Sequence, residues 1–163
     1  MTTRSGEEDA AGDFFSRAAV IATVMVFGLT YSLAAPLLAV DLARQGHASW
    51  VIGANAAMHA VGALLTALIL PRLVAYAVPR RLVLASIGLA SVILLAFPHL
   101  PWLSAWFALR FVLGMATEAL FVTSETWISA LATERTRART MAAYTSALSA
   151  GLALGPLTLS LLG

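Results

Sequence analysis

The sequence contains no cysteine and no lysine, and only 11% of its residues are charged. Without cysteine, the chain has no disulfide framework and no thiolate site for zinc or redox chemistry. Soluble domains usually carry about 25% charged residues, whereas this chain combines its low charge with 60% hydrophobic residues. A chain of 163 residues cannot bury that much apolar surface in one soluble core. A lipid bilayer accepts it, because the outer faces of membrane helices contact lipid instead of water.

Motifs for catalysis and for metal binding are also missing. The sequence has no Gly-x-Ser-x-Gly elbow, no His-Glu-x-x-His and no glycine-rich phosphate loop. Its three histidines, at positions 47, 59 and 99, are too scattered to form a metal site. Nucleic-acid binding needs a basic stripe on a soluble face, and the sequence offers none. We therefore expect no enzyme, no cofactor or metal, and no nucleic-acid partner.

Five hydrophobic stretches are long enough to cross a bilayer, whose core of about 30 Å needs about 20 helical residues. Each must be a helix, because lipid offers no partner to the backbone polar groups of a single open span. The predicted spans are residues 18–43, 48–70, 82–97, 104–131 and 141–163. The expected fold class is all-α, a polytopic transmembrane helical bundle. The short links make neighbouring helices antiparallel.

Both ends of the chain carry expectations of their own. Residues 1–16 are polar and mixed in sign, which predicts a disordered cytoplasmic tail. A secretory signal peptide is the weaker interpretation, since the leader is acidic and further spans follow. The chain stops in the apolar run Leu161-Leu162-Gly163 after an odd number of spans. We expect an incomplete chain, with a genuine five-helix protein as the alternative.

The distribution of arginine predicts the orientation in the membrane. Eight arginines lie in the amino-terminal tail, the second link and the fourth link, whereas Arg44 and Arg110 lie on the opposite side. Because cytoplasmic loops carry the excess of positive charge, the amino terminus is predicted to be cytoplasmic. The eight are Arg4, Arg17, Arg72, Arg80, Arg81, Arg135, Arg137 and Arg139.

Three charged residues lie inside the predicted span 104–131: Arg110, Glu118 and Glu125. At about 100° per residue they share a stripe about 80° wide. An ionisable residue inside the membrane is a functional candidate by default and faces a bundle interior or a wet cavity. The alternative is structural. A glutamate can hold helices together through an ion pair or hydrogen bond, and Arg110 can extend to the outer interface.

The chemistry of these carboxyl groups stays open at this point. A carboxyl group in a low-dielectric cavity can exchange a proton near physiological pH, as a proton-coupled carrier requires. A deprotonated carboxylate would instead attract a cationic substrate.

A second polar stripe lies on the predicted span 48–70. Asn55, His59, Gly62 and Thr66 fall within a narrow sector of that helix. The stripe either lines a pathway, with His59 as a titratable group, or forms interhelical hydrogen bonds where glycine allows close approach. Packing is favoured for Asn55, Gly62 and Thr66, and His59 fits both roles equally. Asn55 and His59 join the pathway candidates.

Three ordered motifs resemble those of the major facilitator superfamily, a family of membrane transporters. The segment from Arg110 to Gly114 is similar to the family's opening of helix four. Arg137-Ala138-Arg139 is similar to its cytoplasmic Arg-Gly-Arg segment, with alanine in place of glycine. Gly151, Gly155 and Pro156 are similar to the start of its glycine-proline motif in helix five. Arg110 followed by Glu125 resembles a small bacterial branch of the superfamily, which implies a bacterial inner membrane as the location.

The second link departs from the family pattern. Only Arg80 and Arg81 remain of its charged motif, while Tyr76 and Pro79 stand where aspartate and glycine are usual. The resemblance implies cytoplasmic gating roles for Arg80, Arg81, Arg137 and Arg139, which this departure weakens.

The resemblance implies secondary active or facilitative transport of a small molecule, with proton coupling as one option. Such carriers have two six-helix halves with the site at mid-membrane. The chain would then supply the first five helices, with lipid, the remaining helices and a small-molecule substrate as its partners. The alternative is a structural or assembly subunit of a membrane complex, without transport activity of its own.

Overall fold

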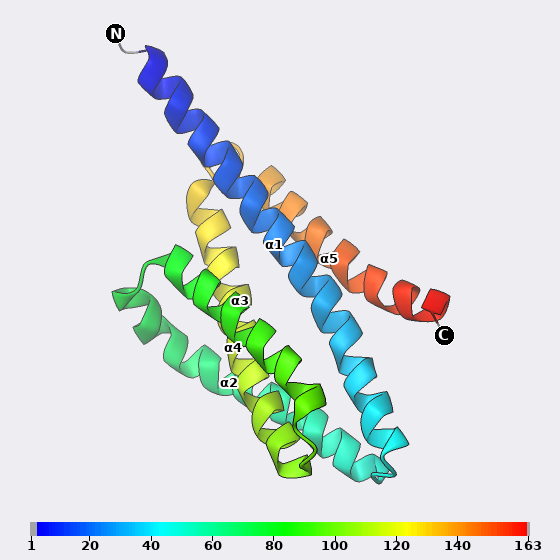
Figure 1. The fold of residues 1–163 in the computed structure, drawn as a ribbon. Coiled ribbons are helices and arrows are strands. Elements are labelled where there is room, and N and C mark those ends of the chain that lie inside the picture. The colour runs from blue at the N-terminus through cyan, green and yellow to red at the C-terminus, as the bar shows by residue number, and fades with distance from the viewer. Residues whose placement is uncertain (1–2, 163) are drawn as a thin grey trace. The chain divides into compact units, whose positions relative to one another are not determined.

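The chain is helical throughout the part that its structure, a computed structural model, describes: the backbone of residues 3–162 and the side chains of residues 15–161. No strand occurs within this part, which confirms the all-α fold class. Figure 1 shows the helices in chain order. They are α1 (Thr3–Arg44), α2 (Ser49–Tyr76), α3 (Pro79–Ala96), the short 3₁₀ helix η1 (Phe97–His99), α4 (Leu103–Leu131) and α5 (Arg137–Leu162).

Four segments are long and apolar enough to cross a membrane, so the chain is a multi-pass membrane protein. They are Phe15–Arg44, Ser49–Tyr76, Pro79–His99 and Leu103–Leu131. The fifth helix, α5, has 26 residues but is not among the apolar spans of the described residues. It contains serine, threonine and glycine at many positions. Its crossing of the membrane therefore stays a prediction.

The amino-terminal segment differs from its prediction. We expected residues 1–16 to be disordered, but α1 is helical from Thr3 onward. The physical reason is that extending a formed helix avoids the cost of nucleation, and alanine and glutamate are good helix formers. Residues 1–2, and the side chains before Phe15, lie outside the described part.

Several helices begin or end beyond the predicted bounds. α2 continues through Pro71 to Tyr76, and α3 begins at Pro79, whose fixed φ suits the first position of a helix. α5 begins at Arg137, so Arg137 and Arg139 lie in its first turn and not in the link. Apolar length predicts the part of a helix that lipid needs, whereas backbone hydrogen bonding can continue past the hydrocarbon core.

The link between α1 and α2 is a Schellman turn centred on Gly46. This residue has φ +82°, a left-handed conformation that glycine adopts without steric cost. His47 N donates to Leu42 O at 3.1 Å, and Gly46 N donates to Ala43 O at 3.0 Å. These two bonds satisfy carbonyl groups that the end of α1 would otherwise leave without a donor. The link is therefore short, and α2 turns back immediately.

The chain divides into two compact units, and both α1 and α4 contribute to each. Unit 1 comprises residues 1–33 and 124–163, and unit 2 comprises residues 34–123.

The core of unit 2 is a cluster of large apolar side chains around Trp106. The indole of Trp106 packs edge-on against Phe97, with ring centroids 5.1 Å apart, and its Nε1 donates to Leu100 O at 2.8 Å. Leu42, Ile93 and Leu113 complete the cluster. This burial fixes the turn between α3 and α4.

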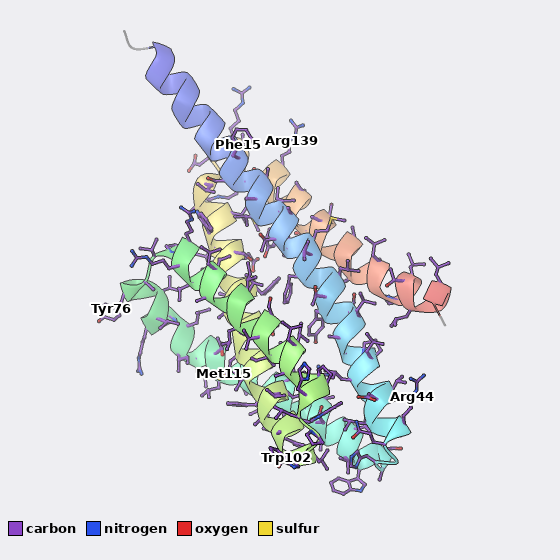
Figure 2. All side chains as sticks on the ribbon, viewed as in Figure 1. Phe15, Arg44, Tyr76, Trp102, Met115 and Arg139 are labelled. Atoms are coloured by element: carbon purple, nitrogen blue, oxygen red, sulfur yellow. The ribbon has the colours of Figure 1, made fainter. Side chains whose placement is uncertain are left out.

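The tryptophans near helix ends have different environments. Trp50 and Trp102 are 75% and 64% exposed, as side chains at a membrane interface would be. Tyr76, at the other end of α2, is 94% exposed and points away from the helices in Figure 2. Trp106 instead is only 4% exposed, so proximity to a helix end does not decide whether an aromatic residue faces lipid.

Unit 1 is built on close packing of α1 against α5, which lie side by side in Figure 1. A Cβ placed on Gly28 would lie 2.8 Å from Leu148 O. A Cβ on Gly151 would overlap Met25 O, and one on Gly155 would overlap the side chain of Ser32. Gly151 and Gly155 of α5 therefore allow a close approach to α1.

Candidate functional site

The predicted pathway residues fall into both units. Asn55, His59, Arg110 and Glu118 belong to unit 2, whereas Glu125 belongs to unit 1. The charged stripe predicted along α4 therefore contributes to two separate environments.

In unit 2, α2 and α4 cross at two glycines. A Cβ on Gly62 would overlap the carbonyl oxygen of Phe111, and a Cβ on Gly114 would overlap the carbonyl oxygen of His59. Each helix thus places a glycine against the backbone of the other. The predicted packing role of Gly62 is confirmed, and Gly114 is its counterpart on α4.

Polar side chains surround this crossing. Thr117 Oγ1 lies 3.4 Å from His59 Nε2, and Thr66 Oγ1 donates to Met115 O at 3.4 Å. Thr117 also donates to its own helix, at Leu113 O, 2.9 Å away. The narrow stripe predicted on the second span therefore faces α4. Thr66 forms an interhelical hydrogen bond, as the packing interpretation predicted, and the ring of His59 lies against the hydroxyl group of Thr117.

Arg110 is buried in unit 2, with 5% of its surface exposed. The alternative that Arg110 extends to the outer interface is therefore wrong in this structure. Its guanidinium lies close enough to His59 to act on that ring electrostatically. We call His59, Arg110 and Thr117, together with the buried Asn55, the crossing cluster.

Two buried polar atoms of unit 2 lack a hydrogen-bond partner within the described residues: Asn55 Nδ2 and Thr123 Oγ1. Their residues are only 2% and 1% exposed. Leaving a buried polar group unsatisfied costs about 1–3 kcal/mol, so such groups are rare in folded proteins. Sequence reasoning named Asn55 but missed Thr123, because nothing in the spacing of a single threonine marks it.

Glu118 is only partly buried, and no hydrogen bond or ion pair to its carboxylate occurs in the described part of the chain. The structural alternative, in which Glu118 holds helices together through such a contact, therefore has no support there.

Glu125 lines a cavity of about 410 Å³ in unit 1. The cavity lies between the last two turns of α4 and the first turns of α5. Its lining consists of Glu125, Thr126, Ser129, Ala130, Arg137 and Met141. We call it the hairpin cavity. The structure thus brings together Glu125 and Arg137, which sequence reasoning had assigned to different roles.

Two contacts that the sequence did not predict hold the helices around this cavity. Ser124 Oγ and Tyr144 Oη are 2.9 Å apart and join α4 to α5 at a depth where both residues are almost fully buried. Arg17 donates to Leu131 O at 2.6 Å. A cation at the carboxyl end of a helix interacts favourably with the helix dipole, so α1 is anchored to the end of α4.

The arginines expected to gate the cytoplasmic side are exposed. Arg80 and Arg81 lie in the first turn of α3, and Arg137 and Arg139 in the first turn of α5. Figure 2 shows Arg139 extending away from α5. A gating role for these side chains stays a prediction. Within the described residues, no three histidine, aspartate or glutamate side chains gather as a metal site would require.

The sequence was compared with protein families, with curated proteins and with solved structures. The family model of the Major Facilitator Superfamily matches residues 20–163. Searches of the curated proteins and of the solved structures give no match.

Proposed function

Because the chain belongs to the Major Facilitator Superfamily, we propose that it serves secondary active or facilitative transport of a small molecule across a bacterial inner membrane. The family carries out membrane transport of substrates, and the family match over residues 20–163 is the observation that carries the proposal. The four apolar membrane-length segments are consistent with that function.

The crossing cluster is the proposed pathway site in unit 2. Arg110 is a buried charge within an apolar span, and such residues mark substrate or ion pathways more often than packing contacts. Asn55 supports this role, because its buried Nδ2 has no hydrogen-bond partner in the described part. A guanidinium, an imidazole and an amide within one region offer several hydrogen-bond donors to a ligand.

Glu118 is the proposed proton-coupling group. Its carboxylate lies within an apolar span and has no ion pair in the described residues, so binding a proton is the simplest way to neutralise its charge. Glu118 lies outside the crossing cluster, whose titratable or charged groups are His59 and Arg110. The guanidinium of Arg110 keeps its charge at all physiological pH values, whereas protonation of His59 would alter the field at that cluster.

The proposed orientation has the amino terminus in the cytoplasm. Arg80, Arg81, Arg137 and Arg139 are exposed at helix starts, which suits the positively charged side of a membrane protein.

The test is uptake into proteoliposomes that contain the protein as its complete coding region produces it. A panel of labelled small molecules identifies the substrate, and a trapped pH dye reports proton movement. For the wild type we expect uptake that depends on external pH. Glu118→Gln keeps the size of the side chain but cannot exchange a proton, and it should flatten that dependence.

Glu134→Gln is the matched control, because Glu134 is exposed in the link after α4. It should leave the pH profile unchanged. An unaltered profile in Glu118→Gln would remove Glu118 from coupling. A complete absence of uptake for every compound tested would refute transport and favour an assembly role.

A further inference from the structure

We propose that the hairpin cavity is a binding site for a zwitterionic group, one that carries an ammonium together with a carboxylate or phosphate. The proposal goes beyond transport, because binding in this cavity does not require the chain to move anything across the membrane. The group could belong to a free small molecule or to a lipid headgroup. Both sources present the same ammonium and anion to the cavity, and the lipid composition of the membrane distinguishes them.

The first argument is size and position. The volume of about 410 Å³ lies in the range of small-molecule sites. All lining residues come from one continuous stretch between Glu125 and Met141, within unit 1. Glu125 lies six residues before the end of α4, which corresponds to a depth of about 9 Å along the helix axis. The cavity is open on one side, and its lining residues are exposed or half-buried, so a polar group can enter it from outside the hairpin.

The second argument is charge. The Glu125 carboxylate and the Arg137 guanidinium line the same cavity from different helices. Neither side chain has a hydrogen bond or ion pair among the described residues, so they do not pair with each other. Two separated and opposite charges in one cavity match a ligand that carries both an ammonium and an anion.

The remaining lining groups suit the rest of such a ligand. Ser129 lies one turn after Glu125 on the same face of α4, so its hydroxyl can share the ammonium. Met141 lies one turn after Arg137 on α5 and offers an apolar surface to the carbon atoms between the two charges.

The third argument is that the walls are held in place. The Ser124–Tyr144 contact fixes α4 against α5 beside the cavity. In the link between α4 and α5, the Thr133 and Thr136 hydroxyl oxygens are 2.8 Å apart, and Arg137 N donates to Thr133 O at 2.8 Å. A site whose walls are already ordered loses less entropy when it binds a ligand.

The experiment uses the absence of cysteine from the chain. Ser129→Cys introduces a single thiol into the cavity of the full chain, which is purified and placed in nanodiscs of phosphatidylglycerol. The rate of thiol modification by a neutral maleimide is then measured with and without phosphoethanolamine. Bound ligand covers the thiol, so the rate should fall about tenfold when the probe is present at ten times its Kd. Ethanolamine or inorganic phosphate alone should protect far less.

Matched variants connect the protection to the cavity. Glu125→Gln and Arg137→Gln, each combined with Ser129→Cys, should abolish protection because each removes one of the two charges. Ser146→Cys is the control thiol. Ser146 is exposed on α5, about 140° around the helix from Met141, and phosphoethanolamine should not change its modification rate.

The lipid composition of the nanodiscs shows whether the ligand is a lipid headgroup or a free small molecule. Slower modification of Ser129→Cys in phosphatidylethanolamine nanodiscs, without any soluble probe, assigns the site to a headgroup. Protection by soluble phosphoethanolamine in both lipids assigns it to a free molecule. Either result supports the proposal.

Equal modification rates under all conditions would overturn it, as would protection by phosphate alone that matches protection by phosphoethanolamine. A change in rate caused by the charge variants without any effect of lipid or probe would show that the two charges influence only the reactivity of the thiol, and it would overturn the proposal as well. Transport by the complete protein with no protection at Ser129→Cys would refute this site while leaving the transport function intact.

Discussion

Replacing Gly62 with alanine tests the close crossing of α2 and α4. A Cβ at this position would overlap the carbonyl oxygen of Phe111 and approach Met115 N at 3.1 Å. Both are backbone atoms, so the overlap cannot be relieved by a change of side-chain rotamer. The two helices must therefore move apart. That movement would break the contact of His59 with Thr117 and the hydrogen bond from Thr66 to Met115 O.

The magnitude follows from two opposing effects. Overpacking a well-packed contact costs about 1–3 kcal/mol, whereas replacing glycine by alanine within a helix contributes about 0.5–1 kcal/mol of stability. Gly53 on the same helix is exposed, and a Cβ there would meet nothing within 4 Å. Gly53→Ala should therefore show only the favourable effect. The favourable effect is present in both variants and cancels, so their free energies of unfolding should differ by the overpacking cost alone, about 1–3 kcal/mol.

The assay is equilibrium unfolding of the purified protein in mild detergent with increasing dodecyl sulfate, followed by tryptophan fluorescence. Trp106 lies in the core of unit 2 and reports its loss. Gly62→Ala should unfold at a lower denaturant fraction than the wild type, and Gly53→Ala at the same or a higher one. Coincident curves for the two variants would refute the close crossing.

Two further changes address the other contacts. Tyr144→Phe removes the hydroxyl that lies 2.9 Å from Ser124 Oγ. In the same assay it should lower the free energy of unfolding by about 0.5–1.5 kcal/mol. A variant as stable as the wild type would show that this contact does not hold α4 against α5. Trp106→Phe keeps an aromatic ring against Phe97 but loses the bond from Nε1 to Leu100 O. It should destabilise unit 2 more than Trp102→Phe does, because Trp102 is 64% exposed, and the reverse order would contradict the assigned core.

The arrangement of the spans could be predicted from the sequence because lipid imposes simple rules. Apolar length identifies a helix, and the 3.6-residue period identified the face of α2 that carries Asn55, Gly62 and Thr66. That face is buried in the structure. The period works here because one sector of α2 contacts α4 and the others do not, which is the condition under which a stripe predicts a contact.

The predictions that failed concern residues whose environment depends on a partner helix. Arg110 was assigned a possible path to the outer interface, but it is buried. Thr123 was overlooked, and the contact of Tyr144 with Ser124 was not predicted, since a buried hydroxyl becomes informative only when its neighbours are known. The starts of α3 and α5 were placed too late, because arginines at a membrane surface are as compatible with a first helical turn as with a loop.

The charged residues of α4 show why a shared stripe does not imply a shared role. Arg110 is buried beside His59, Glu118 is partly buried and has no ion pair in the described part, and Glu125 lines a cavity opposite Arg137. Helical periodicity places all three on one sector, but each faces a different set of neighbours.

A single substitution on α4 therefore tests one environment at a time. If Glu118→Gln alters proton coupling while Glu125→Gln alters only protection of the hairpin cavity, the two carboxylates act independently. If either variant changes both readouts, the two environments are energetically coupled, and the whole length of α4 is one functional element.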